Sequence, residues 1–311
     1  MAEPLLLADG AAPRERHPLV GYAMVVAAAT LWAINGVVSK VILEEDVSSQ
    51  RLAEIRSAGA FVGLALGVVV FAPGTLRLSR REIPTLVLFG VGGLAFVQWF
   101  YFVAIHRLDI GVALLIQYLA PLLVALWARY VMKHPVRRRI WVALGLALVG
   151  LVFVLGVGGE TTLSTVGVVA CLLAACAYAL YVLVAEREVD VRDPISLTTY
   201  GFFFAALFWS ILQPWWSFPA EALDATRANA WDLPVWALVV WMIVLGTIVP
   251  FGLLVASLRF VSATRAAITA MFEPVAAIVI AWLWLGEELS AIQLGGGALV
   301  LAGIVLAQTA R

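Results

Sequence analysis

The side chains in this sequence that could take part in chemistry are polar groups placed inside long apolar segments. These groups are Asn35, Lys40, Glu54, Arg56, Gln98, Gln117, Arg129 and Glu273. An ionised group at the centre of a bilayer costs on the order of 3 kcal/mol on insertion scales, so each charge needs a partner or a water-filled cavity. Glu54 lies one turn from Arg51, and for these two residues we predict a structural ion pair.

Glu273 has the most unusual position, because Pro274 follows it directly. A proline inside a helix removes one backbone hydrogen bond and leaves a carbonyl free, which can open a kink beside the acidic side chain. Two roles follow for Glu273. It is either a site for a proton or a substrate amine in a central cavity, or a carboxylate satisfied by neighbouring hydroxyl groups or an arginine.

Several aromatic residues also fall within the apolar segments rather than at their ends, where tryptophans usually anchor a protein in the interface. Trp32 and Tyr178 occupy matching positions of an internal repeat, and each lies one helical turn from a second polar group, Asn35 or Tyr181. Anchoring or contact with lipid is the alternative role for these rings. The predicted substrate-binding residues are Trp32, Asn35, Gln98, Trp99, Tyr101, Gln117, Tyr178, Tyr181 and Glu273.

The composition is that of a membrane protein. Of the residues, 63% are hydrophobic and 13% are charged, whereas about a quarter are charged in ordinary soluble domains. The formal net charge is zero, and no basic face or arginine-rich tail indicates binding to nucleic acid. The histidines, His17, His106 and His134, lie at or outside the predicted membrane edges. Neither His-Glu-x-x-His nor Gly-x-Ser-x-Gly occurs, so we predict no metal site, no cofactor and no enzymatic activity.

These residues must be positioned by helices, and a helix needs roughly 20 apolar residues to cross a hydrocarbon core of ~30 Å. The fifth predicted span is short, and the polar run 198–200 interrupts the seventh. Residues 1–17 hold too short an apolar run for a cleaved signal, and we expect a cytoplasmic arm there. The ten predicted spans are 18–43, 50–71, 83–104, 110–132, 140–156, 165–186, 194–213, 234–258, 262–284 and 290–308.

Two stretches of the chain carry one hydrophobic pattern with opposite charge at the matching turn. Residues 111–151 contain a basic turn at 133–139, while the corresponding turn of residues 264–304, at 286–288, reads Gly-Glu-Glu. Basic turns stay in the cytoplasm and acidic turns do not. The pattern therefore predicts two related halves inserted in opposite directions, which is the inverted repeat of many secondary transporters.

The predicted halves are residues 18–156 and 165–308, with five spans each. If the N-terminus is cytoplasmic, the outer loops contain only Arg107 and Arg227 as basic residues, and most other basic residues lie in inner segments. The positive-inside rule thus places both termini in the cytoplasm. The predicted fold is an all-α membrane protein of ten transmembrane helices, arranged as two inverted five-helix repeats around a central cavity.

The chain resembles a known family, the EamA-type transporters of the drug/metabolite transporter superfamily. Trp32-Ala33-Ile34-Asn35 resembles the opening of the EamA repeat, and Arg56 stands where that repeat often has arginine. The resemblance covers residues 18–308 and departs from the family pattern at Lys133-His134, which replaces the usual Gly-Glu. The residues similar to the end of the repeat are Glu273-Pro274, Trp284-Leu285-Gly286-Glu287, Leu294-Gly295 and Leu301-Ala302-Gly303.

The resemblance implies two inverted five-helix repeats and the export of small metabolites, and several bacterial members of the family export amino acids. The aromatic-rich, weakly charged interior suits aromatic or other neutral amino acids. We therefore predict a secondary transporter that exports such amino acids across the bacterial cytoplasmic (inner) membrane. The alternatives are an exporter of a different metabolite or drug-like compound and, in another class, a non-transporting receptor or an intramembrane enzyme.

The expected mechanism is alternating access, in which the two halves rock around a site near the middle of the bilayer. Pro121 and Pro274, in matching spans, are the predicted hinges. Transport is either coupled to protons through Glu273 or not coupled to an ion. One internal pseudo-dimer in each chain is consistent with a monomer.

Overall fold

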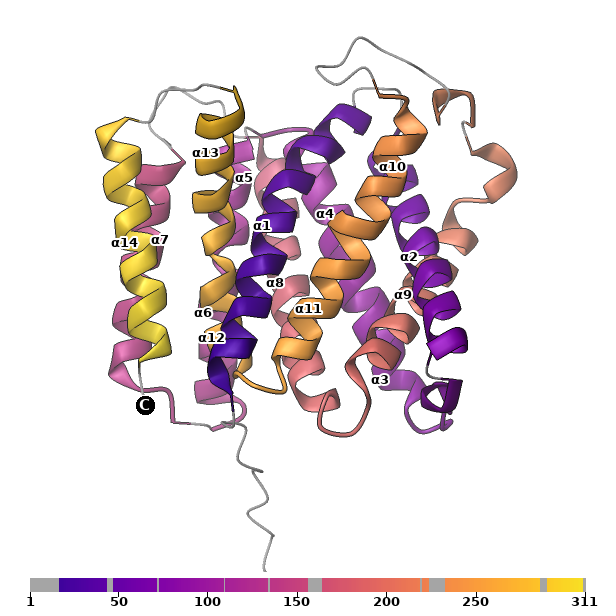
Figure 1. The fold of residues 1–311 in the computed structure, drawn as a ribbon, viewed down its shortest axis with the longest axis horizontal. Coiled ribbons are helices and arrows are strands. Elements are labelled where there is room, and N and C mark those ends of the chain that lie inside the picture. The colour runs from indigo at the N-terminus through magenta and orange to yellow at the C-terminus, as the bar shows by residue number, and fades with distance from the viewer. Residues whose placement is uncertain are drawn as a thin grey trace, which may run out of the picture.

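The computed structural model describes residues 17–43, 47–71, 73–108, 110–133, 135–155, 164–218, 220–223, 233–285 and 290–309. Residues 1–16 of the predicted arm and the acidic turn at 286–288 therefore lie outside the described residues. The regular elements within the described residues are all helical, which confirms the predicted all-α class. The long helices run side by side between two edges of the molecule, and α1 begins at the edge where α14 ends (Figure 1).

The elements are α-helices and other helical segments, labelled η, of which η2 and η5 are wide π-helical turns inside longer helical stretches. Their bounds are α1 Pro18–Leu43, α2 Ser49–Phe71, η1 Pro73–Leu76, α3 Ile83–Val87, η2 Leu88–Ala95, α4 Phe96–Ile105, α5 Ile110–Gln117, α6 Ala120–Tyr130, α7 Arg138–Val154, α8 Thr165–Glu188, α9 Pro194–Leu212, η3 Trp215–Ser217, η4 Ala220–Leu223, α10 Val235–Ile243, η5 Val244–Ile248, α11 Val249–Ser257, α12 Ala263–Ala270, α13 Phe272–Leu285 and α14 Ala291–Gln308.

Eight helical stretches in the described chain are long and apolar enough to cross a membrane. The predicted spans at 140–156 and 262–284 are not among them. The first of these is α7, which has 17 residues and is shorter than the roughly 20 that a span needs. The second is divided at Met271 into α12 and α13.

The seventh predicted span shows no interruption, because α9 continues unbroken through its polar run. The hydroxyl of Thr198 donates to the carbonyl of Pro194 at 2.7 Å, and that of Thr199 donates to the carbonyl of Ile195 at 2.7 Å. Both hydroxyl groups are thereby satisfied within their own helix. The predicted span at 194–213 is thus confirmed, and its polar run leaves the helix intact.

The two stretches with matching sequence fold alike. α5 and α6 separate just before Pro121, and α12 and α13 separate just before Pro274. A proline cannot donate to the carbonyl four residues earlier, and its ring clashes with that carbonyl, so each helix breaks at this point. A second likeness lies in the stretches α3–η2–α4 and α10–η5–α11, each of which contains a segment of wide turns.

The helices α7 and α14, which follow these breaks, pack closely and run antiparallel. Gly150 of α7 lies against Gly296 of α14, while Gly303 of α14 lies against Ala143 of α7. From the first contact to the second, the residue number falls along α7 and rises along α14, so the two helices are antiparallel. Backbone meets backbone at this crossing, as small residues allow. The pair forms one end of the molecule in Figure 1.

At the other end of the molecule, α2 packs against α9. An arginine at the beginning of α2 forms hydrogen bonds with the segment that follows α9. Arg51 is 7% exposed and donates to Glu54 Oε2 at 2.6 Å, which confirms the predicted ion pair. The same guanidinium donates to the hydroxyl of Ser217 at 2.6 Å and to the carbonyl of Pro214 at 3.3 Å. We call this group of contacts the Arg51 clasp.

A second arginine, next to the beginning of α9, forms hydrogen bonds with the segment that follows α2. Arg192 is 8% exposed and donates to Ser196 Oγ at 2.9 Å, to Glu82 Oε1 at 2.8 Å and to the carbonyl of Arg77 at 3.0 Å. The backbone N–H of Ser79 and the Arg192 guanidinium lower the pKa of Glu82, so this carboxylate stays charged in mildly acidic solution. These contacts, the Arg192 clasp, lie at the opposite end of the α2–α9 pair from the Arg51 clasp.

The close crossing of α7 and α14 leads to a prediction with a neighbouring control. A Cβ added to Gly296 would lie 2.7 Å from the Gly150 carbonyl oxygen, whereas a Cβ added to Gly295 meets nothing within 4 Å. We expect Gly296→Ala to destabilise the protein by ~1–3 kcal/mol through overpacking. Gly295→Ala should be neutral or slightly stabilising, because it removes a flexible residue from a helix. Thermal unfolding in detergent measures both variants, and equal melting temperatures would contradict the close crossing.

Candidate functional site

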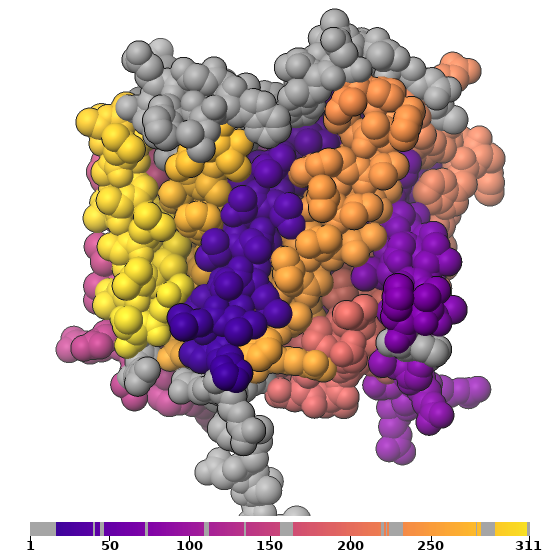
Figure 2. Space-filling view, in the orientation of Figure 1, coloured from indigo at the N-terminus to yellow at the C-terminus, as the bar shows by residue number. Residues whose placement is uncertain are grey.

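A cavity lies in the middle of the bundle, where helices of both halves meet. It is lined by residues of α1, α2, α4, α5, α6, α8, α11, α12 and α13. Figure 2 shows α1 at the molecular face between α13–α14 on one side and α10–α11 on the other. The cavity has a volume of about 100 Å³. A single water needs roughly 10–15 Å³ of such a volume, so there is room for a small solute.

The two helix breaks lie at the cavity wall, and matching residues of both halves reach it. Pro121 lines the cavity beside Ala120, and Glu273 occupies the position in the second half that Ala120 has in the first. Trp32 and Tyr178, the other matching pair, also line the cavity. Pro274 itself is not among the lining residues. The cavity therefore lies where the two repeats meet, as sites in repeat-built transporters usually do.

Glu273 is held by a tyrosine from the other half. Tyr118 lies in the turn between α5 and α6, and its hydroxyl donates to Glu273 Oε2 at 2.7 Å. The same hydroxyl lies 3.5 Å from the carbonyl oxygen of Ala270, the residue four positions before Pro274. This is the carbonyl that the proline deprives of its helical donor. Tyr118 thus connects the break in one half to the break in the other.

Arg56 is the second charged residue of the cavity lining, and the wide turn of η5 holds it in place. Its Nε donates to Thr247 Oγ1 at 2.6 Å, and its Nη2 donates to the carbonyl of Gly246 at 2.8 Å. The rings of Phe102 and Phe251 lie 5.9 and 5.7 Å from the guanidinium carbon. Such contacts fix a cation in a position that would otherwise be costly for a charge.

Arg56 and Glu273 line the same cavity but do not pair with each other. Ion pairs join Arg51 to Glu54, Arg192 to Glu82, and Arg259 to Asp193, but none joins Arg56 to Glu273. Glu273 instead accepts a hydrogen bond from a neutral hydroxyl, and Arg56 donates to neutral oxygen atoms. The cavity thus presents one negative and one positive group that are separately held.

Several buried polar atoms at the cavity have no hydrogen-bond partner among the described residues. Gln98, which is 4% exposed, has neither its Oε1 nor its Nε2 paired. Buried polar atoms are usually hydrogen-bonded, so a group of unpaired ones marks a place where a polar molecule can bind. The other unpaired atoms of the lining are Trp32 Nε1, Asn35 Oδ1, Ser39 Oγ, Gln117 Oε1 and Tyr178 OH.

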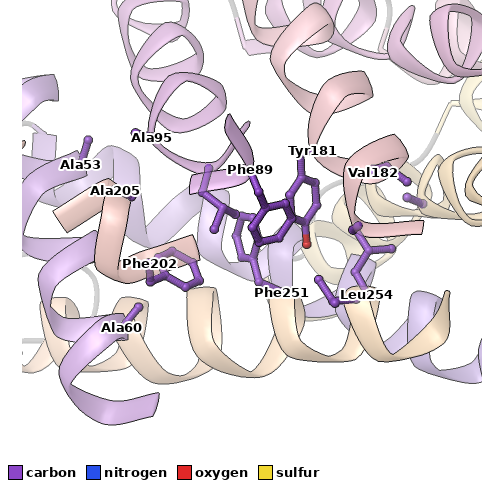
Figure 3. Packing of buried hydrophobic residues seen from close by; sticks show 14 of the residues in the cluster. Ala53, Ala60, Phe89, Ala95, Tyr181, Val182, Phe202, Ala205, Phe251 and Leu254 are labelled. Atoms are coloured by element: carbon purple, nitrogen blue, oxygen red, sulfur yellow. The ribbon is translucent and has the colours of Figure 1, made fainter. Parts of the chain in front are cut away.

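Seven of the nine predicted substrate-binding residues line this cavity, and two do not. Trp99 packs instead against Trp209 and Phe100, with ring centroids 5.5 and 5.3 Å apart. Tyr181 stacks on Phe89 within the hydrophobic core at 5.3 Å (Figure 3). The seven that line the cavity are Trp32, Asn35, Gln98, Tyr101, Gln117, Tyr178 and Glu273. Their role in binding stays a prediction.

The predicted set leaves out Arg56 and Tyr118, although both line the cavity. Arg56 is a charge within an apolar span, and that signal alone could have placed it in the set. Tyr118 gives no such signal, because a tyrosine within a span is equally compatible with packing. Within the described part of the chain, no three metal-ligating side chains come together.

Comparison with known proteins agrees with this arrangement. The model of the EamA-like transporter family matches residues 19–156 and 165–309. A solved crystal structure superposes with a TM-score of 0.74 over 92% of this chain and 96% of its own, at 18% sequence identity, and shows the fold alone.

Curated relatives cover most of the chain. The threonine/homoserine exporter RhtA of Escherichia coli is 30% identical over 258 residues, which are 80% of each protein. The uncharacterized transporter YdfC of Bacillus subtilis is 26% identical over 79% of this chain and 85% of its own. The uncharacterized inner membrane transporter YicL of Salmonella typhimurium is 24% identical over 92% of this chain and 94% of its own.

The family model covers both halves, and a relative at 30% identity spans most of the chain, which confirms the resemblance seen in the sequence. The chain belongs to the EamA-like transporter family of the drug/metabolite transporter superfamily, and it is a multi-pass membrane transporter and not an enzyme.

Proposed function

We propose that this transporter exports neutral amino acids, each held as a zwitterion between Glu273 and Arg56. The observation that carries the proposal is the presence of these two opposite charges in one cavity without an ion pair between them. An α-ammonium group complements the carboxylate, and an α-carboxylate group complements the guanidinium. A molecule with both groups at one end neutralises both residues at once.

The energetics favour a ligand with two charges over a ligand with one. A hydrogen bond to a charged group contributes about 1.5–3 kcal/mol, and a charge left without a partner in a dry site is unfavourable. A monovalent anion or cation would satisfy one of the two residues and leave the other unpaired. The volume of the cavity also suits a solute of amino-acid size more than a large drug-like compound.

Two features of relatives and fold support the direction and the mechanism. RhtA of Escherichia coli is a threonine/homoserine exporter, and YicL is an inner membrane transporter, so we place this chain in the cytoplasmic membrane as an exporter. The antiparallel packing of α7 and α14 supports the predicted inverted five-helix repeats, with α7 and α12–α13 as the remaining two of ten spans. The halves would then alternate between inward- and outward-open states, bending at Pro121 and Pro274.

Counterflow in proteoliposomes tests the proposal. We expect labelled neutral amino acids to exchange with unlabelled ones, and the matching 2-hydroxy acids and amines, which each lack one charge, to compete poorly. Glu273→Gln and Arg56→Gln should each lower the efficiency of exchange about 10- to 100-fold, the loss expected for a charged hydrogen bond. Glu221→Gln, a change of an exposed carboxylate on η4, serves as the matched control.

Exchange of des-amino analogues at the rate of the parent amino acids would show that Glu273 does not bind the ammonium group. The same variants address coupling. If Glu273 also carries protons, the pH dependence of uptake should flatten in Glu273→Gln, and an unchanged pH profile would exclude that role.

The bond between Tyr118 and Glu273 gives a second prediction. Tyr118→Phe removes the only donor that the described residues offer to Glu273, so the carboxylate is less well positioned. We expect KM to rise about 5- to 10-fold, the value of one ordinary hydrogen bond, with little change in maximal rate. In a Glu273→Gln background the same substitution should change KM less than about twofold.

Tyr178→Phe serves as the comparison, because the Tyr178 hydroxyl lies in the same cavity and has no hydrogen-bond partner among the described residues. Its effect on KM should be the same in both backgrounds. If Tyr118→Phe also has equal effects in both backgrounds, Tyr118 does not act through Glu273.

A further inference from the structure

We propose that Gln98 makes this cavity selective for amino acids whose side chains are uncharged and form hydrogen bonds, namely hydroxyl and amide side chains. This inference rests on the proposed amino-acid site and adds to it the class of side chain that the site accepts.

Gln98 is unlike the charged residues of the cavity, because no hydrogen bond within the described chain holds its amide. Glu273, Tyr118 and Arg56 each have a hydrogen-bond partner within the protein. Gln98 is as deeply buried as Arg56, at 4% against 5% exposed, yet both ends of its amide lack a partner in the described chain. A buried polar group left unpaired destabilises the protein, so a ligand that pairs with it recovers free energy.

The same lining contains a further amide with an unpaired atom. Gln117, on α5, also faces the cavity, and its Oε1 has no partner among the described residues. Neither residue is needed to neutralise a charge, because Arg56 and Glu273 suffice for the two charged groups of a zwitterion. The amides are therefore free to contact the rest of the ligand, which is its side chain.

The chemistry of an amide decides which side chains fit. An amide presents a hydrogen-bond donor at one end and an acceptor at the other, and a hydroxyl or a second amide can form hydrogen bonds with both. A hydrocarbon side chain forms no hydrogen bond with either end, so the Gln98 amide would stay unpaired and shielded from water. Apolar lining residues on the same elements, such as Val97, Phe102 and Leu114, can pack against the carbon atoms of a short side chain. Sites built to bind a hydroxyl group discriminate strongly against analogues that lack it.

Threonine and valine provide the test, because they have nearly the same shape and differ by a hydroxyl in place of a methyl group. Counterflow in proteoliposomes gives the ratio of their exchange efficiencies, measured as maximal rate over KM. We expect the wild type to favour threonine at least 10-fold, and serine over alanine in the same sense.

Gln98→Met keeps the length of the side chain and removes its hydrogen-bonding atoms. We expect this variant to bring the ratio of threonine to valine close to one, chiefly through loss of threonine exchange. Gln308→Leu, a change in the last residue of α14 and outside the cavity lining, is the matched control and should keep the wild-type ratio.

The outcomes separate this inference from the proposed function. Equal exchange of threonine and valine by the wild type, or a Gln98→Met variant that keeps the preference, overturns the role of Gln98 and leaves the amino-acid carrier standing. Absence of exchange with every amino acid overturns both. If Gln98→Met fails to fold, the comparisons of threonine with valine and of serine with alanine in the wild type still decide whether the site selects hydrogen-bonding side chains.

Discussion

Backbone carbonyls that lose their helical donor inside a membrane need another partner, and this requirement organises the centre of the molecule. Pro274 frees the carbonyl of Ala270, which lies 3.5 Å from the Tyr118 hydroxyl. Pro250 has no N–H to donate to the carbonyl of Gly246, four residues earlier, and Arg56 donates to this carbonyl at 2.8 Å. The side chains that set the charge of the cavity are thus held by irregular backbone. The irregular helix segments therefore provide the acceptors that position the polar residues of the cavity.

The scaffold is repeated, but the chemistry of the cavity is not. Trp32 and Tyr178 occupy matching positions and both line the cavity, as do Ala120 and Glu273. In the second pair one half offers a methyl group and the other a carboxylate. The amides with unpaired atoms, Asn35, Gln98 and Gln117, all come from the first half. A lining with such polarity can orient an asymmetric ligand, which a strictly symmetric cavity could not do.

Much of this arrangement can be predicted from the sequence, because hydrocarbon makes polar residues conspicuous. Glu273, Gln98, Asn35 and Gln117 stand out as polar groups in apolar spans, and all four line the cavity. Trp99 does not, since it directly follows Gln98 and neighbouring residues on a helix point about 100° apart. Tyr181 does lie one turn from Tyr178, yet it packs on Phe89, a contact that periodicity cannot reveal.

Contacts between distant parts of the chain account for what the sequence leaves open. The bond from Arg56 to Thr247 joins residues separated by 191 positions, and the bond from Tyr118 to Glu273 joins residues separated by 155. No local pattern specifies either pair. The likeness of the two halves indicates which helices meet, but the partners at the cavity are not matching residues. Their pairing depends on side-chain packing.

The two arginine clasps have a consequence for how the protein is made. Arg51 and Glu54 are synthesised well before Pro214 and Ser217, so the Arg51 clasp can close only once the chain extends through α9 to Ser217 in the second half. The Arg192 clasp, in turn, needs Glu82 and Arg77 from a half that is already in place. Each half therefore provides hydrogen-bond partners for an arginine of the other half, one at each end of the α2–α9 pair. A polypeptide interrupted between the halves would therefore leave Arg51 without Ser217 and Arg192 without Glu82, so each fragment would keep only part of its clasp.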